Sequence, residues 1–270
     1  MTQLNYIDIH AHFDTYEPEE RQAVLGRMRE HGVHAIAVGT DVQSSQSVVR
    51  LAREEESVSA CVGVHPDASR DADLDMIAGL AGDPQVVAIG ECGFDYFRRE
   101  GREGGGSDRD DLKPVQQAVF ERQVELAVQY QKPLMLHVRP AKDSMDAYED
   151  TLELLESYAQ EHGEALGGNA HFFAGTVEHA RRFLEIGFTL SFTGVITFTN
   201  DYDEVIRYIP SDMLHAETDS PFVAPVPYRG KQNEPSYVQH VVERLARIRD
   251  EDPQVLGKAL VDNARRLFGV

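Results

Sequence analysis

Short apolar runs alternate with amphipathic stretches along the whole chain of 270 residues. The apolar runs are nearly continuous, which is typical of strands buried on both faces of a parallel sheet, and the stretches between them show helical spacing. We expect strands at residues 6–12, 34–40, 58–65, 86–92, 133–138, 169–174, 188–194 and 213–219. We expect helices at about residues 17–31, 44–56, 71–82, 114–131, 143–162, 176–186, 201–209, 235–249 and 253–268.

Eight strand–helix units in a chain of this length predict a (β/α)8 TIM barrel, with a doubly wound open sheet as the alternative. No linker rich in Pro, Gly or Ser divides the chain, so we expect a single domain over residues 1–270. One segment interrupts the pattern, RREGREGGGSDRDDLK at residues 98–113. Its glycines and charges cannot bury enough apolar surface to order it, which predicts a mobile loop after the fourth strand.

The first predicted strand, YIDIHAH, places Asp8, His10 and His12 at alternate positions. Successive side chains of a strand point to opposite faces, so we expect these three to share one face. A buried polar group costs a few kcal/mol unless something pairs with it. The strand therefore predicts a partner for these side chains elsewhere in the chain.

Further histidines and acids lie where other predicted strands end, namely His65, Glu91, His137 and Asp219, and His171 lies within the predicted strand 169–174. A lone histidine in a strand is usually a hydrogen-bonded core residue, and an acid at a strand end often caps the next helix. In a barrel, however, all these positions meet at the carboxyl-terminal mouth, where barrel enzymes build their active sites. This convergence favours one shared metal site.

The donor types narrow the chemistry of that site. Imidazole and carboxylate ligands without thiolates suit Zn, Mn, Fe, Ni or, with more water, Mg. Four histidines and two carboxylates are enough for two ions that share a bridging carboxylate. Two ions about 3.5 to 4 Å apart favour hydrolysis, most naturally of a phosphodiester.

Charge and cysteine content restrict the class further. The net charge of −20 argues against an extended grip on a nucleic-acid duplex, although a local cationic site can still hold a phosphate. The two cysteines, Cys61 and Cys92, have neither disulfide-framework nor zinc-ribbon spacing. With no signal-peptide or membrane-spanning pattern, we expect a soluble, unprocessed cytoplasmic protein without membrane contact, and we infer no stable protein partner.

Seven motifs resemble the TatD family of metal-dependent hydrolases over nearly the whole chain. They are DIHAH (8–12), GVHP (63–66), AIGECGFDY (88–96), KPLMLHVR (132–139), HFFAG (171–175), ETDSPFVAPVPYRGKQNEPSYV (217–238) and NARRLF (263–268). The resemblance implies a barrel nuclease or related phosphoester hydrolase with two divalent ions (Mg, Mn or Zn), acting on single-stranded DNA ends. It implies that His10, His12, Glu91 and Asp219 hold the first ion, and that Glu91, His137 and His171 hold the second.

Other residues receive expected roles from their positions. We expect Asp219 and Glu91 to be catalytic, with Asp219 as the general base. His65, Arg139 and Arg229 are candidates for binding substrate phosphate, and a surface ion pair is the alternative for each arginine. Asp8 either orients the neighbouring histidine rings or ties its strand into the barrel, and the sequence does not decide between the two.

Two other functions are compatible with the same metal site. The first is a deacylase or other ester or amide hydrolase, for example one acting on D-aminoacyl-tRNA. The second is a metal-stabilised barrel without catalysis, which we disfavour because a structural zinc site usually has four ligands and often uses thiolates.

Overall fold

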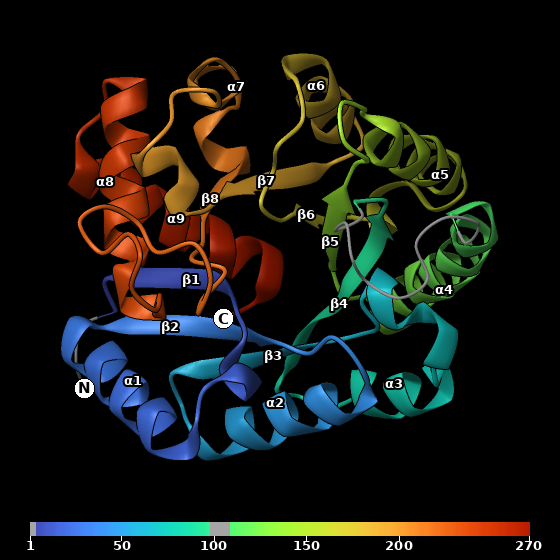
Figure 1. Ribbon diagram of the computed structural model, residues 1–270, viewed down its shortest axis with the longest axis horizontal. Coiled ribbons are helices and arrows are strands. Elements are labelled where there is room, and N and C mark those ends of the chain that lie inside the picture. Colours follow the sequence, from blue (N-terminus) through green and yellow to red (C-terminus); the bar gives the residue numbers. More distant parts are fainter. Residues whose placement is uncertain (1–3, 98–108) are drawn as a thin grey trace.

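The computed structural model describes residues 4–97 and 109–270, in which eight strands form one parallel sheet in sequential order (Figure 1). The strands are β1 (Tyr6–Ala11), β2 (Val33–Val38), β3 (Val58–Val62), β4 (Val86–Asp95), β5 (Leu134–Arg139), β6 (Gly168–Ala170), β7 (Phe188–Phe192) and β8 (Leu214–Ala216). A doubly wound sheet reverses its strand order at a switch point, and this sheet does not. The predicted TIM barrel is therefore confirmed.

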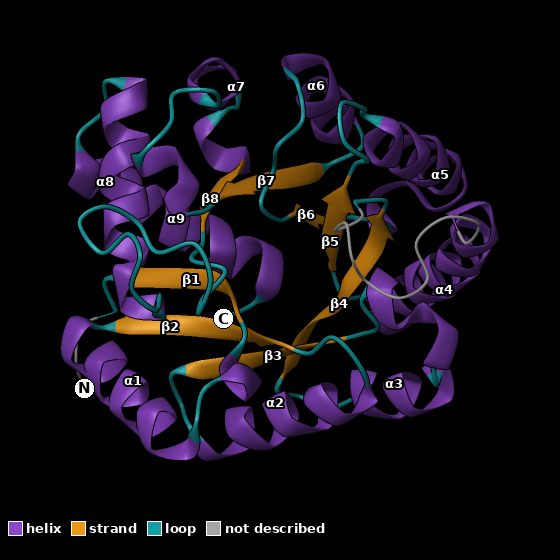
Figure 2. Ribbon diagram, in the orientation of Figure 1, coloured by secondary structure: helices purple, strands orange, loops and turns teal. Residues whose placement is uncertain are grey.

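Helices surround the strands as an outer layer, as Figure 2 shows. The α-helices are α1 (Pro18–His31), α2 (Val42–Glu54), α3 (Leu74–Ala81), α4 (Arg109–Tyr130), α5 (Asp146–His162), α6 (Val177–Glu185), α7 (Asp203–Tyr208), α8 (Val238–Arg249) and α9 (Pro253–Phe268). Residues 109–113 belong to α4, so the predicted loop is wrong for this part. The rest of that loop, residues 98–108, lies outside the described residues.

Local sequence signals explain where several helices begin and end. Asp41 caps α2 in a capping box with Ser44, and Asp252 caps α9 immediately before Pro253. Gly32 ends α1 in the left-handed conformation, which glycine adopts without steric cost. These capping residues fix where the helices begin and end, and so they keep the connections between successive strands short.

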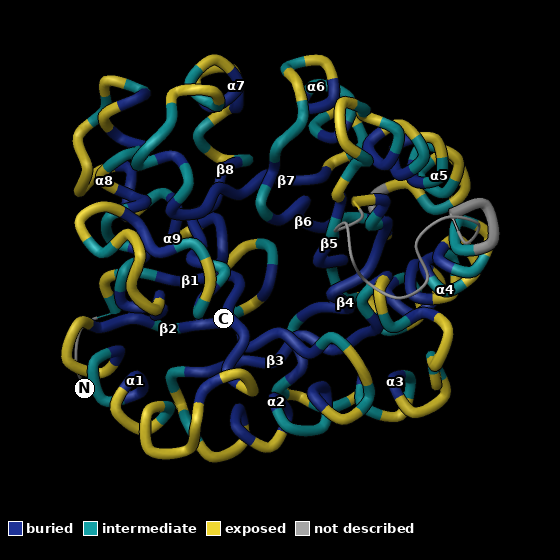
Figure 3. Tube along the Cα trace, in the orientation of Figure 1, coloured by how far each residue is buried: buried dark blue, intermediate teal, exposed yellow. Residues whose placement is uncertain are grey.

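The apolar core has two parts. The larger lies between the strands and the outer helices, and Figure 3 shows the strands buried while exposed positions gather on the helices. The smaller fills one end of the barrel, where side chains of β1 and β2 such as Ile9 and Ile36 pack against α9 residues such as Val261 and Phe268. Because α9 covers this end, the strand ends at the opposite mouth are left to form a cavity.

The ring is closed between β8 and β1 just beyond the end of β8. Asp219 N donates to His10 O at 3.0 Å, and His12 N donates to Ser220 O at 2.8 Å. A single isolated bridge, Ala11 to Ser220, joins the two segments. We call this junction, residues 10–12 with 218–220, the seam.

A bulge in β1 makes the predicted alternation of Asp8, His10 and His12 wrong. Asp8 pairs with Ala35 and Ala11 with Ala37, so β1 carries one residue more than β2 over this span. One extra residue reverses the facing of everything beyond it. Asp8 therefore lies on the face of Ala35, toward the outer core, whereas His10 and His12 face the barrel mouth.

Candidate metal centre

The acids and histidines expected at strand ends converge at one mouth of the barrel. His10 and His12 come from β1 and its end, Glu91 from β4 and His137 from β5. His171 directly follows β6, and Asp219 follows β8 after two further residues, so both lie beyond their strands rather than within them as predicted. A cavity of about 810 Å³ opens here and is lined by His12, His65, Glu91, His137, His171 and Asp219 among others.

The first group of donor atoms surrounds the ring nitrogens of His10 and His12. Their Nε2 atoms lie 3.2 Å apart, and Asp219 Oδ1 lies 3.8 and 3.3 Å from them respectively. Glu91 Oε2 is 3.7 Å from each. Each of the two rings thus has one oxygen of Asp219 and one oxygen of Glu91 within 4 Å.

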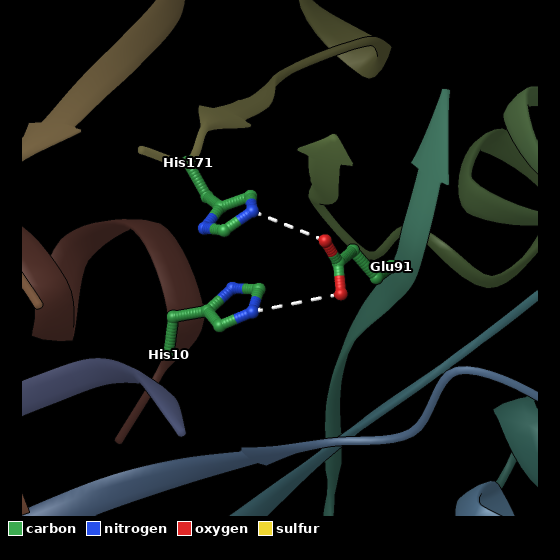
Figure 4. A group of neighbouring side chains, drawn as sticks. All are labelled: His10, Glu91 and His171. Atoms are coloured by element: carbon green, nitrogen blue, oxygen red, sulfur yellow. Dashed lines mark ion pairs between the residues drawn. The ribbon is translucent and has the colours of Figure 1, made fainter. Parts of the chain in front are cut away.

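Glu91 faces a second group with its other oxygen. Its Oε1 lies 3.1 Å from His171 Nε2 and 2.6 Å from His137 Nδ1. Figure 4 shows the carboxylate between His10 and His171, with one oxygen directed at each ring. Glu91 therefore lies between the two groups of histidine rings.

The donor set fits divalent cations. Two ligand atoms that share an ion at about 2.1 Å lie roughly 3 to 3.5 Å apart in tetrahedral geometry. The separations around His10 and His12 fall at or slightly above this range. His10, His12 and Asp219 form one cluster with ligand spacing, and His10, Glu91 and His171 form another.

Burial and mutual charge set the protonation of the centre. Burial alone would raise the pKa of Glu91, but the histidines around it outweigh burial and hold that pKa well below its ordinary value. Burial would likewise raise the pKa of Asp219, but its interactions with the histidines, chiefly the hydrogen bond with His12, outweigh burial and lower that pKa. Burial lowers the pKa of His137, but its carboxylate partners Asp95 and Glu91 outweigh it and raise that pKa to about 9. The carboxylates of Glu91 and Asp219 are therefore ionised, as carboxylates that bind a metal must be.

Glu217, which follows β8, supports His171 from behind. It is fully buried, and its Oε1 lies 3.3 Å from His171 Nδ1 while accepting a hydrogen bond from Phe172 N at 2.6 Å. Ser191 Oγ donates to the other oxygen at 2.9 Å. The contact with Nδ1 is an ion pair without hydrogen-bond geometry, so Glu217 acts on the His171 ring through its negative charge.

Two glutamines of α4, which the strand-end pattern does not single out, hold the backbone near the centre. Gln123 accepts from Val64 N at 2.8 Å and donates to Val64 O at 3.0 Å. Gln116 accepts from Asp95 N at 3.2 Å and donates to Asp95 O at 3.1 Å. Their seven-residue spacing, which places them on one helix face, was the available signal.

The structure separates the two candidate arginines. Arg139 lines the cavity and lies over the ring of Phe97 at 4.2 Å. Arg229 lies over the ring of Phe198 at 4.1 Å and is not among the residues that line this cavity. Of the two, only Arg139 is placed where a ligand in the cavity could meet it.

Fold and site together define a parallel (β/α)8 barrel with a histidine and carboxylate centre of the metal-binding type at its mouth. The chain belongs to the family described as TatD related DNase, whose model matches residues 7–269. The predicted resemblance to the TatD family of metal-dependent hydrolases is thereby confirmed.

Individual relatives match over almost their whole length. The uncharacterized metal-dependent hydrolase YabD of Bacillus subtilis is 34% identical, over 97% of this chain and 98% of the relative. The 3'-5' ssDNA/RNA exonuclease TatD of Salmonella typhimurium is 32% identical, over 93% of this chain and 94% of the relative. The crystal structure of YjjV, a TatD homologue of Escherichia coli, is 27% identical with a TM-score of 0.82 over 99% of each chain. Among the described residues, no helix has the length and apolarity needed to cross a bilayer.

Proposed function

We propose that this protein is a metal-dependent phosphodiesterase that shortens single-stranded DNA from an end. The observation that carries the proposal is the position of Glu91, whose two oxygens face two separate groups of histidines. A carboxylate placed between two such groups is the arrangement of a two-metal hydrolase. The Salmonella typhimurium relative, named as an exonuclease on single-stranded DNA and RNA, supports the choice of substrate.

We assign the ligands as the family resemblance implies them. His10, His12, Glu91 and Asp219 would hold one divalent ion, and Glu91, His137 and His171 would hold a second, with Mg, Mn and Zn as the candidates. In support of this assignment, Glu91 lies within ion-pair distance of all four of these histidines. When bound, such ions supply Lewis acidity at the phosphate and lower the pKa of the attacking water.

Asp219 and Glu91 are the catalytic carboxylates in this proposal. Asp219 directs Oδ1 at the histidines, which leaves Oδ2 to accept the proton of the attacking water. The water oxygen forms a bond to phosphorus while the ester bond to the departing nucleotide breaks, and the leaving oxygen takes up a proton. The products are a hydroxyl and a phosphate monoester.

The cavity favours a single strand over a duplex. Its volume of about 810 Å³ suits one or two nucleotides, and its lining includes Arg139, which can bind a phosphate, and the rings of Phe172 and Phe222, which can stack on a base. The net charge of −20 disfavours long contacts with duplex phosphates.

The test is a labelled single-stranded oligonucleotide with Mn²⁺ or Mg²⁺, with and without chelator. We expect stepwise shortening that stops with chelator, with Glu91→Gln and with His171→Ala, while Asp262→Asn on the exposed face of α9 retains full activity. Undiminished cleavage by Glu91→Gln would contradict the proposal.

One further substrate and a metal analysis complete the test. Hydrolysis of charged tRNA with intact oligonucleotides would indicate the deacylase instead. Bound metal without turnover of either substrate would indicate the non-catalytic barrel.

A further inference from the structure

His65 lies among the candidate metal ligands, but one of its ring nitrogens accepts a hydrogen bond from the backbone. It follows β3, lines the cavity, and places Nε2 at 3.8 Å from Glu91 Oε1. Its ring contacts that of His137 edge to face, with centroids 4.2 Å apart. By proximity alone, His65, Glu91 and His137 would form a third metal-binding cluster.

One hydrogen bond excludes His65 from that role. Asp67 N lies 3.1 Å from His65 Nδ1, where His65 caps the short helix that begins at Pro66. A backbone N–H can only donate, so Nδ1 is the acceptor and the proton of the neutral ring is on Nε2. A neutral histidine that binds a metal through Nε2 must carry its proton on Nδ1, and at His65 that proton would face the N–H of Asp67.

The backbone around His65 is held in place from several sides. His65 N donates to Thr40 O at 2.8 Å, and the buried Gln123 binds both backbone groups of Val64. A Cβ at Gly63 would lie 2.5 Å from the carbonyl carbon of Gly90, so only glycine allows this approach to the residue before Glu91. The Nε2–H is thus presented to the cavity in a fixed direction.

A fixed N–H donor beside this centre calls for an anionic acceptor. The distance of 3.8 Å to Glu91 exceeds that of a hydrogen bond, so Glu91 is not that acceptor. Arg139, which lines the same cavity, is also a donor that matches phosphate oxygens. We propose that His65 is a substrate-binding residue that donates its Nε2–H to a non-bridging phosphate oxygen, and that it is not a metal ligand. This inference rests on the proposed function, because it assumes that a phosphate enters the cavity.

The metal part of the test uses His65→Phe, which removes the donor, and His65→Gln, which restores an amide N–H near the Nε2 position. Mn²⁺ binding to the full chain is followed by calorimetry and by metal analysis, and circular dichroism verifies folding. We expect both variants to keep the wild-type number of ions and a Kd within about threefold of wild type, because no ligand is removed. His137→Phe is the contrast and should weaken Mn²⁺ binding by tenfold or more.

The phosphate part uses inorganic phosphate added to the Mn²⁺-loaded proteins. A hydrogen bond to a charged group predicts a Kd for phosphate about 10- to 100-fold higher in His65→Phe, and within roughly fivefold of wild type in His65→Gln. The kcat/KM for a labelled oligonucleotide should fall strongly in His65→Phe and only slightly in His65→Gln.

The outcomes separate this inference from the proposed function. Loss of a Mn²⁺ ion in His65→Phe, or an unchanged Kd for phosphate, would overturn the role of His65. If the wild type binds phosphate through His65 and cleaves no phosphodiester, the proposed function fails and the role of His65 stands.

Discussion

Thr218 donates two hydrogen bonds to the carboxylate of Asp8, from N to Oδ1 at 2.8 Å and from Oγ1 to Oδ2 at 2.5 Å. His10 N lies 3.3 Å from the same Oδ1. Within the described residues, His10 Nδ1 has no hydrogen-bond partner, so Asp8 does not hold that ring nitrogen. From the sequence, Asp8 could either orient the neighbouring histidine rings or tie its strand into the barrel. These contacts support the second role, a tie between β1 and the segment after β8.

Removing the Thr218 hydroxyl should weaken this tie. Thr218→Val keeps the shape but leaves Asp8 Oδ2 without its donor, so we expect the free energy of unfolding to fall by about 1 to 3 kcal/mol. Thr218→Ser retains the hydroxyl and is the control. Urea denaturation of the three proteins measures the difference, and equal stability of Val and Ser variants would show that the hydroxyl contributes nothing.

Glu217 should govern the affinity of the second metal site. Glu217→Gln removes the charge beside His171 Nδ1, and we expect Mn²⁺ affinity at that site to fall by about 10- to 100-fold. Ser191→Ala removes a hydrogen bond to the other oxygen of Glu217 and should change affinity by less than about threefold. Calorimetric titration distinguishes them, and equal effects would mean that the contact with His171 is unimportant.

Gln123 should be needed for stability as well as for placing His65. Gln123→Leu leaves the buried N–H and C=O of Val64 without partners, which we expect to cost about 2 to 4 kcal/mol. Gln117→Leu changes an exposed glutamine of the same helix and should stay within about 0.5 kcal/mol of wild type. Urea denaturation measures both variants, and a mild effect of Gln123→Leu would contradict the importance of these two bonds.

His215 on β8 predicts a pH dependence of stability. Burial lowers its pKa to about 3, and neither ring nitrogen has a hydrogen-bond partner within the described residues. Below its ordinary pKa of 6.5 the unfolded state binds a proton that the folded state excludes, so this group destabilises the fold increasingly as pH falls from 6.5 toward 3.

The substitution His215→Leu should remove that dependence. Between pH 7 and pH 5, the free energy of unfolding of the variant should rise by about 2 kcal/mol relative to that of the wild type. The reason is that an excluded proton costs about 1.36 kcal/mol for each pH unit below 6.5. Urea denaturation at both pH values measures the gain. Parallel pH profiles of the two proteins would show that His215 is not the source.

The sequence predicts the barrel because the same pattern, an apolar strand followed by an amphipathic helix, repeats along the chain. Eight apolar runs separated by helical periodicity leave few arrangements, and polar residues at the strand ends are brought together by any parallel barrel. The apolar runs predict His171 and Asp219 inside strands, whereas β6 and β8 end before them, yet the convergence of both residues with Glu91 does not depend on those boundaries. The pattern of polar residues near strand ends is therefore enough to indicate where they meet.

What the sequence could not predict depends on single insertions and distant contacts. The bulge in β1 adds one residue between Asp8 and Ala11, and no residue type in DIHA marks it. Gln123 resembles any polar residue of a helix surface until the segment around Val64 lies against it. The state of His65 likewise depends on one backbone N–H of the following turn.

The seam also joins segments far apart in the chain, since His10 and Asp219, which are hydrogen-bonded across it, are 209 positions apart. A cation held by His10, His12 and Asp219 would act across this junction as a reversible cross-link, restricting a very long loop. By mass action, each increase in free metal concentration would then favour the closed ring over any state in which the ends of the barrel have separated. Amide hydrogen exchange at His12 and Asp219 would report that closure directly, as protection that rises with metal concentration.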